Sequence, residues 1–136
     1  MIVGVPLVIK RSANRIGYSA ILHSDMDALG LLKEIIAAYE RHGWRLKRVL
    51  LQSSTRAALA GQAEQLFKEA TVHDAEFDAL WFARRSHGNR QAWELRLIDE
   101  QRYALFEAFE ADESEEEREE VRREMENRMR EYATSV

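Results

Sequence analysis

The sequence has no cysteine, a single proline and no long apolar run. The lack of cysteine excludes a disulfide scaffold, a thiolate metal centre and a cysteine nucleophile. No hydrophobic segment approaches the roughly 20 residues that are needed to cross a bilayer. Glycine is scarce as well. Its six residues stand apart from one another, so no glycine-rich loop is present to cradle a phosphate.

The chain has 136 residues, of which 46% are hydrophobic, and this composition predicts one folded domain with its own core. The charge is unevenly distributed. Residues 112–136 hold 10 acidic and five basic residues, a net charge of −5, whereas residues 1–111 hold 14 acidic and 15 basic residues, a net charge of +1. We therefore expect a nearly neutral body over 1–111. We expect an acidic, charged helix over 112–136, either part of the same domain or an oligomerisation element.

The N-terminal segment is apolar but has no charged region before it, which argues against a signal peptide and favours a cytoplasmic protein. Residues 3–9 alternate in polarity and predict a strand, which Pro6 confines to a sheet edge or to a late start. Residues 16–22 alternate again, so the two segments together predict a hairpin.

Further along the chain the polarity pattern changes between the helical and the strand period. A helix is expected from Ser24 to His42, followed by a strand over 44–51 that is apolar on both faces. A second helix is expected from the serines at 53–54 to about Ala70. The remaining pattern predicts strands over 76–84 and 93–97, a segment over 103–109 that fits either a strand or the start of the last helix, and a helix over 115–132.

This order, ββαβαβββα, predicts an α+β domain with a mixed sheet of about five to six strands and helices packed on the sheet. The strand–helix–strand units favour some parallel pairing through right-handed crossovers, and the hairpins add antiparallel pairs.

The C-terminal helix begins with Ser114 and Glu117 at the spacing of a capping box. Its apolar stripe is thin, and such a helix needs a surface to pack against. That surface is either the chain's own sheet or another copy or partner, whereas a free helix is the least favoured arrangement. The residues of the stripe, our candidates for an interaction helix, are Val121, Met125, Met129 and Tyr132.

Basic residues gather in two turns and at one helix-to-strand junction. The first turn contains Arg11 and Arg15, and the junction spans 41–48. The second turn contains Arg84, Arg85, His87 and Arg90. Such basic residues have three interpretations. They lie in solvated turns, they contact a nucleic acid or a phosphorylated ligand, or they form a docking site for an acidic protein surface. In addition, the acidic stretch 113–120 could cover the basic turns, within one chain or between chains.

The histidines and carboxylates predict no metal, cofactor or catalytic site. His23 precedes Asp25 and Asp27, but the start of a helix at Ser24 makes these acids capping residues. His73 lies in a segment that we interpret as a solvated loop entering a strand. No serine stands in a nucleophile elbow. A small acid–base enzyme using His23, Asp25, His73 or His87 is therefore an alternative without positive support.

The sequence thus favours a binding or adaptor protein over an enzyme. Its expected partner is another protein or a second copy of the same chain, with which it would form a dimer. Binding of a nucleic acid or a phosphorylated ligand is the alternative, and no membrane contact is expected. The net charge of the body, +1, argues against strong non-specific binding of nucleic acid. No motif is specific enough to identify a family.

Overall fold

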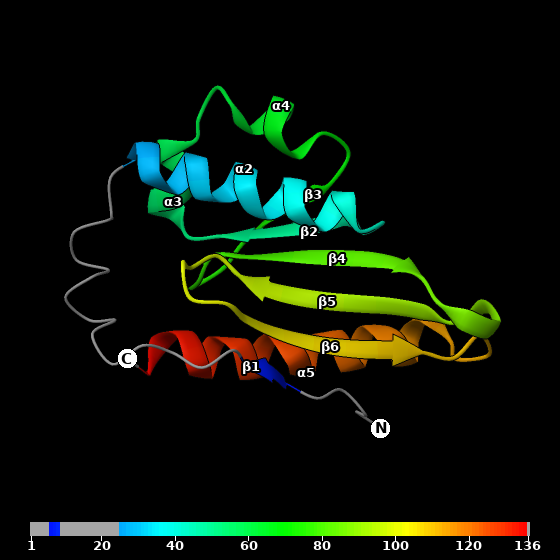
Figure 1. Cartoon of the computed structure of the whole chain (residues 1–136). Coiled ribbons are helices and arrows are strands. Elements are labelled where there is room, and N and C mark those ends of the chain that lie inside the picture. The colour runs from blue at the N-terminus through cyan, green and yellow to red at the C-terminus, as the bar shows by residue number, and fades with distance from the viewer. Residues whose placement is uncertain (1–5, 9–24, 136) are drawn as a thin grey trace.

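A computed structural model describes residues 6–8 and 25–135. Its six strands form one sheet in the order β1-β6-β5-β4-β2-β3 (Figure 1). The strands are β1 (Pro6–Val8), β2 (Arg45–Leu51), β3 (Thr71–Asp74), β4 (Ala79–Arg85), β5 (Gln91–Leu97) and β6 (Tyr103–Phe109). The helices are α2 (Asp25–Arg41), α3 (Ser53–Ala58), α4 (Ala63–Phe67) and α5 (Glu115–Thr134), and a short 3-10 turn, η1 (His87–Asn89), joins β4 to β5.

The sheet is mixed, as the sequence predicts. β2 and β3 are parallel and are connected through α3 and α4, whereas the β4, β5 and β6 meander is antiparallel. β2 also pairs antiparallel with β4, so the start of β2 lies beside the end of β4. The α+β class and the single domain are therefore confirmed.

Helices cover both faces of the sheet, and each face carries its own apolar cluster. On one face, Trp81 of β4 packs with Leu95 of β5 and with Met125 of α5. On the other face, Leu80 and Phe82 of β4 pack beneath α2. Because successive side chains of a strand point to opposite faces, β4 serves both clusters. We call these the α5 face and the α2 face.

The helix predicted from Ser24 is confirmed from Asp25 onward, whereas Ser24 lies outside the described residues. It buries Leu32, Ile36 and Tyr39, which recur at helical spacing. It ends just before Gly43, whose φ of +88° favours glycine.

The prediction of a single second helix is wrong, and so is the prediction of a loop after it. The segment forms two short helices, α3 and α4, because Gly61 takes a φ of +88° between them. The residues around His73, predicted as a solvated loop, belong to a strand, since Thr71–Asp74 is β3. This strand is too short to show a period in the sequence, and its parallel pairing with β2 defines it.

The open choice over 103–109 is settled as the strand β6, which pairs with β5 on one side and with β1 on the other. β1 begins at Pro6 and stands at one end of the described strand order, where proline is tolerated. The predicted strand over 16–22, with the hairpin that would contain it, lies outside the described residues.

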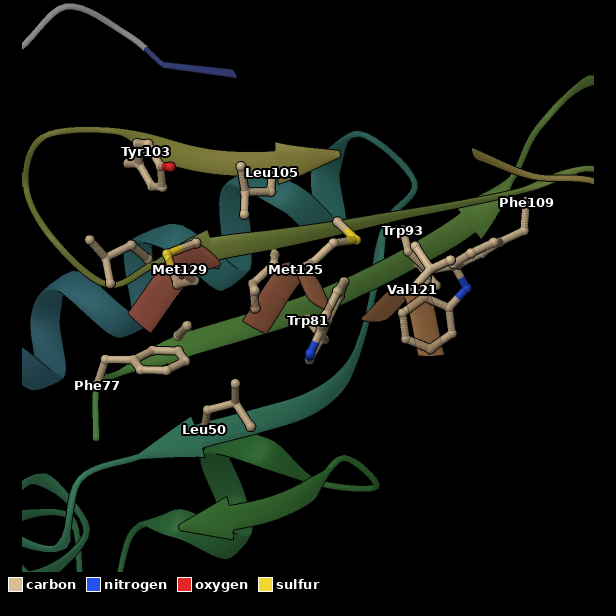
Figure 2. Close-up of a cluster of buried hydrophobic side chains, with 14 residues drawn as sticks. Leu50, Phe77, Trp81, Trp93, Tyr103, Leu105, Phe109, Val121, Met125 and Met129 are labelled. Carbon is tan, nitrogen blue, oxygen red and sulfur yellow. The ribbon is translucent and has the colours of Figure 1, made fainter. Parts of the chain in front are cut away.

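The C-terminal helix α5 packs on the sheet of its own chain. Ser114 and Glu117 form the predicted capping box, with reciprocal backbone–side-chain hydrogen bonds of 2.9 and 3.1 Å. Figure 2 shows Val121, Met125 and Met129 among the side chains of the α5-face cluster. Of the arrangements that the sequence left open for this stripe, the intramolecular one is present.

Candidate interaction surface

Antiparallel pairing of β2 with β4 brings two basic segments together at one end of the sheet. Arg45, at the start of β2, stands opposite Ala83, and β4 ends two residues later at Arg85. Ala83 belongs to the α5-face cluster, so by the alternation of the strand Arg45 and Arg85 both belong to the α5 face. Lys47 lies beside them, where the register shifts between Leu46 and Arg48.

We call Arg45, Lys47 and Arg85 the basic corner. All three side chains are exposed. Within the described part of the chain, no hydrogen bond or ion pair reaches these side chains. Arg45 and Arg85 share the α5 face on adjacent strands, and Lys47 is two residues from Arg45. Cations so placed, with no ion-pair partner among the described residues, form a local positive field that attracts an anionic group.

The residues that the sequence singled out in the second basic turn divide into two pairs. Arg84 donates a hydrogen bond to the carbonyl of His42 (2.7 Å) and stacks on Trp44, 4.6 Å from the ring centroid. Arg90 forms an ion pair with Glu110 at 3.2 Å. Arg85 and His87 are exposed. The hairpin therefore uses two of its cations for contacts within the chain, and Arg11 and Arg15 of the first turn lie outside the described residues.

Beside α5 the sheet continues along β2 and β3, where Arg45 is exposed, Arg48 is half-buried and Leu50 is buried. The register pairs Arg48 with Thr71 and Leu50 with His73, and Leu50 belongs to the α5-face cluster. Thr71 and His73 therefore point to the same side as α5 and are exposed. We call Arg45, Arg48, Thr71 and His73 the ledge. Figure 1 shows α5 along the β5–β6 side of the sheet, away from β3.

One ion-pair network joins α5 to the ledge. Glu119 accepts hydrogen bonds from Arg48 at 2.8 and 3.2 Å and a third from Arg122 at 3.1 Å. Hydrogen bonding to Arg48 is the main reason that the pKa of Glu119 lies below its ordinary value. Arg122 is only 1% exposed, stacks 4.3 Å from the Trp93 centroid and also pairs with Glu115. Within the chain, the acidic stretch thus pairs with Arg48 of the helix-to-strand junction, which is not one of the basic turns that it was predicted to cover.

Other acids of the same stretch have no such partner. Glu116 and Glu120 are exposed, and no hydrogen bond or ion pair to their side chains occurs in the residues that the structure describes. Each precedes a buried methionine, Met125 or Met129, by nine residues, or about 2.5 turns at about 3.6 residues per turn. They therefore lie on the side of α5 that faces away from its own sheet.

The four candidate residues of the interaction helix have partners in their own chain. Val121, Met125 and Met129 are buried in the α5-face cluster. Tyr132 is half-buried and stacks on Tyr103 with a centroid separation of 3.7 Å. The side of α5 left for a partner is thus its charged outer side and not the apolar stripe.

A second polar cluster, on the α2 face, combines Glu94 and Arg96 of β5 with Tyr39 of α2. The Tyr39 hydroxyl donates a hydrogen bond to Glu94, and Arg102 lies 3.8 Å from the same carboxylate. Desolvation raises the pKa values of Glu94 and Tyr39 and lowers that of Arg96. Sequence reasoning did not select these residues. The available signal was that Glu94 and Arg96 stand in a strand that must be covered on both faces.

The described residues give no support to a catalytic or metal site made of histidine and carboxylate side chains. His73 lies on β3, where its Nε2 is 3.0 Å from the Thr71 hydroxyl, and His87 lies in η1. Asp25 is the first residue of α2, and His23 lies outside the described residues. Among residues 6–8 and 25–135 no group of three histidine or carboxylate side chains could hold a metal ion.

Comparison with protein-family models, with curated proteins and with solved structures finds no match to this chain. None of the helices in the described ranges is long and apolar enough to span a membrane. The features that bear on function are therefore those of the surface itself.

Proposed function

We propose that this chain is a small cytoplasmic binding protein without catalytic activity, whose ligand is a protein with an acidic surface. The observation that carries the proposal is the basic corner. Arg45, Lys47 and Arg85 come from two segments that are far apart in the sequence, are exposed together at one end of the sheet and have no counter-charge among the described residues.

The neighbourhood of the corner favours a protein over a nucleic acid. Nucleic-acid binding needs several free cations along a phosphate backbone. Here Arg48 and Arg90 are already paired with Glu119 and Glu110. The exposed carboxylates of Glu116 and Glu120 on α5 would in addition repel a polyanion that extends beyond the corner.

The buried cluster on the α2 face supports a structural role and not the enzymatic alternative. Glu94 is only 3% exposed and accepts a hydrogen bond from the Tyr39 hydroxyl, so this carboxylate is buried and engaged within the protein. A general acid or base must instead lie within hydrogen-bond reach of a substrate.

Affinity capture with charge-reversed bait tests the proposal. The full chain and an Arg45→Glu/Arg85→Glu variant are incubated with a nuclease-treated extract of the native host, and the bound proteins are quantified. Partners with acidic surfaces should be retained by the wild-type chain, released by salt and lost from the variant. An identical set of proteins on both baits would contradict a binding role for the corner.

The matched control is Lys33→Glu/Lys68→Glu. These two lysines are exposed and have no side-chain partner in the described residues, and their reversal changes the net charge by the same amount. The control should bind like the wild-type chain. Loss of binding in the control as well would show that net charge, and not the corner, governs capture.

A further inference from the structure

We propose that the acidic partner of the basic corner is a second copy of this chain, whose outer α5 surface lies on the ledge of the first copy, with Glu116 and Glu120 facing Arg45 and Arg85. This inference rests on the proposed function, because it assigns the partner of the same surface. It uses the charge that the fold leaves exposed on α5 and the strip of sheet that α5 leaves uncovered.

The shape of the α5 face suits such a contact. A helix stands about 10 Å above the sheet on which it packs, and the ledge beside it therefore forms a step. Two copies that meet through their α5 faces can interlock, with each helix over the other's ledge. The side of α5 that then reaches the ledge is the side opposite its buried methionines, where Glu116 and Glu120 lie.

The ends of the elements also match. Gln91 pairs with both Arg85 and Phe109, so the basic corner and the segment that leads into α5 lie at the same end of the sheet. A two-fold axis parallel to α5, between the helix and the ledge, keeps both helices in the same direction. It therefore places the first turns of each helix over the basic corner of the other copy, and every contact forms twice.

The chain already contains one example of the proposed contact. Glu119, from the same part of α5, forms a two-bond ion pair with Arg48 on the ledge. Carboxylates at 116 and 120 are one turn apart on a helix, and Arg45 and Arg85 are diagonal neighbours on adjacent strands. Both spacings are of the same order, so one helix turn can pair with the two arginines.

The experiment uses two charge-reversed variants of the full chain, Arg45→Glu/Arg85→Glu and Glu116→Arg/Glu120→Arg. Sedimentation velocity measures self-association at about 20 mM and about 500 mM NaCl, where screening differs strongly. The wild-type chain should dimerise at low salt and dissociate at high salt. Each variant should self-associate at least about tenfold more weakly, because like charges then face each other at both contacts.

Mixing the two variants gives the decisive result. In a mixed dimer, the substituted corner of one chain meets the substituted helix of the other as opposite charges, and the second contact joins the unchanged corner to the unchanged helix. Both contacts are then attractive, so an equimolar mixture should recover dimers. A chain with all four substitutions restores opposite charges at both contacts and should dimerise by itself, and this second readout keeps the test valid if either double variant folds poorly. The Lys33→Glu/Lys68→Glu variant should dimerise like the wild-type chain.

Three results would overturn the inference, and they are distinguishable from failure of the proposed function. A wild-type chain that stays monomeric at low salt excludes the second copy, while the proposed function stands if Arg45→Glu/Arg85→Glu still loses captured proteins. A dimer that both variants leave intact places the interface elsewhere. Salt-sensitive binding of a mixed-sequence RNA that depends on Arg45 and Arg85 makes the ligand a nucleic acid and overturns both proposals.

Discussion

Each face of the sheet carries a polar cluster with a glutamate, and the two clusters shift the pKa of that glutamate in opposite directions. On the α2 face, Glu94 is buried in β5 under α2, and desolvation raises its pKa. On the α5 face, Glu119 stands at the edge of the helix with its side chain 40% exposed, and the hydrogen bonds from Arg48 lower its pKa. Burial dominates the first carboxyl group and ion pairing dominates the second.

The difference shows which cluster is structural and which is adjustable. A buried polar group is costly to leave without its partner, so the Tyr39–Glu94 hydrogen bond fixes how α2 lies on the sheet. An ion pair at the rim contributes little and is screened by salt. The α5 face can therefore exchange its charged contacts with a partner, whereas the α2 face cannot do so without losing stability.

The largest expected effect comes from Glu94→Ala, which should lower the free energy of unfolding by about 3 kcal/mol. The substitution leaves the Tyr39 hydroxyl and the Arg96 guanidinium buried without the carboxylate. Urea denaturation measures the loss. Glu94→Gln, which keeps an oxygen acceptor for Tyr39, should lose less than half as much, and a loss below about 1 kcal/mol for the alanine variant would refute the structural role.

On the opposite face, Arg122→Ala should destabilise the fold by about 2 kcal/mol, because removal of the guanidinium that stacks on Trp93 and Phe109 leaves a cavity. Arg122→Met keeps an unbranched side chain of similar length and should retain about half of this stability. Equal losses for the two variants in urea denaturation would mean that charge, and not packing, determines the role of Arg122.

A smaller effect is expected at the start of α5. Ser114→Ala removes the hydroxyl that accepts a hydrogen bond from the Glu117 amide at 3.1 Å, and should cost about 1 kcal/mol. Ser114→Asp supplies another good capping group and serves as the control. If α5 gained its position from packing alone, thermal unfolding would not distinguish alanine from aspartate at this position.

The smallest expected effect is a difference in how the stability contributed by each face depends on pH. The stability that Glu119 contributes is present above the ordinary carboxyl pKa of 4.5 and is lost as the pH falls through the lowered pKa. The pKa of Glu94 is raised, so its contribution is present below 4.5 and is lost as the pH rises through the raised pKa.

Melting temperature measured against pH separates these two contributions. Glu119→Gln should flatten the decline on the acid side, and Glu94→Gln should flatten the decline on the side of higher pH. Identical pH profiles for the two variants would contradict the opposite pKa directions.

The elements that the sequence predicted well are those with a local physical cause. The helix stripe of Leu32, Ile36 and Tyr39, the end of α2 before Gly43 and the capping box at Ser114 all depend on residues within a few positions of one another. The alternating faces of β4 were also predictable, because the side-chain period of a strand is two.

The candidate surface was only half predictable. Its basic residues are visible in the sequence as separate runs, but the sequence does not show that Arg84 and Arg90 are engaged within the chain while Arg85 has no partner among the described residues. Only the pairing of β2 with β4 places Arg45 and Lys47 beside the end of β4, where Arg85 lies.

The absence of long apolar runs, the alternation of polarity and the acidity of residues 112–136 determined a mixed sheet with a charged terminal helix. Tertiary structure alone decided that Thr71–Asp74 is a strand, that the apolar stripe of α5 is covered by its own sheet, and that the basic corner and the start of the acidic helix lie at the same end of the sheet. The reason is physical. Periods and caps act over a few residues, whereas strand pairing and the choice of a helix surface join segments that no local pattern connects.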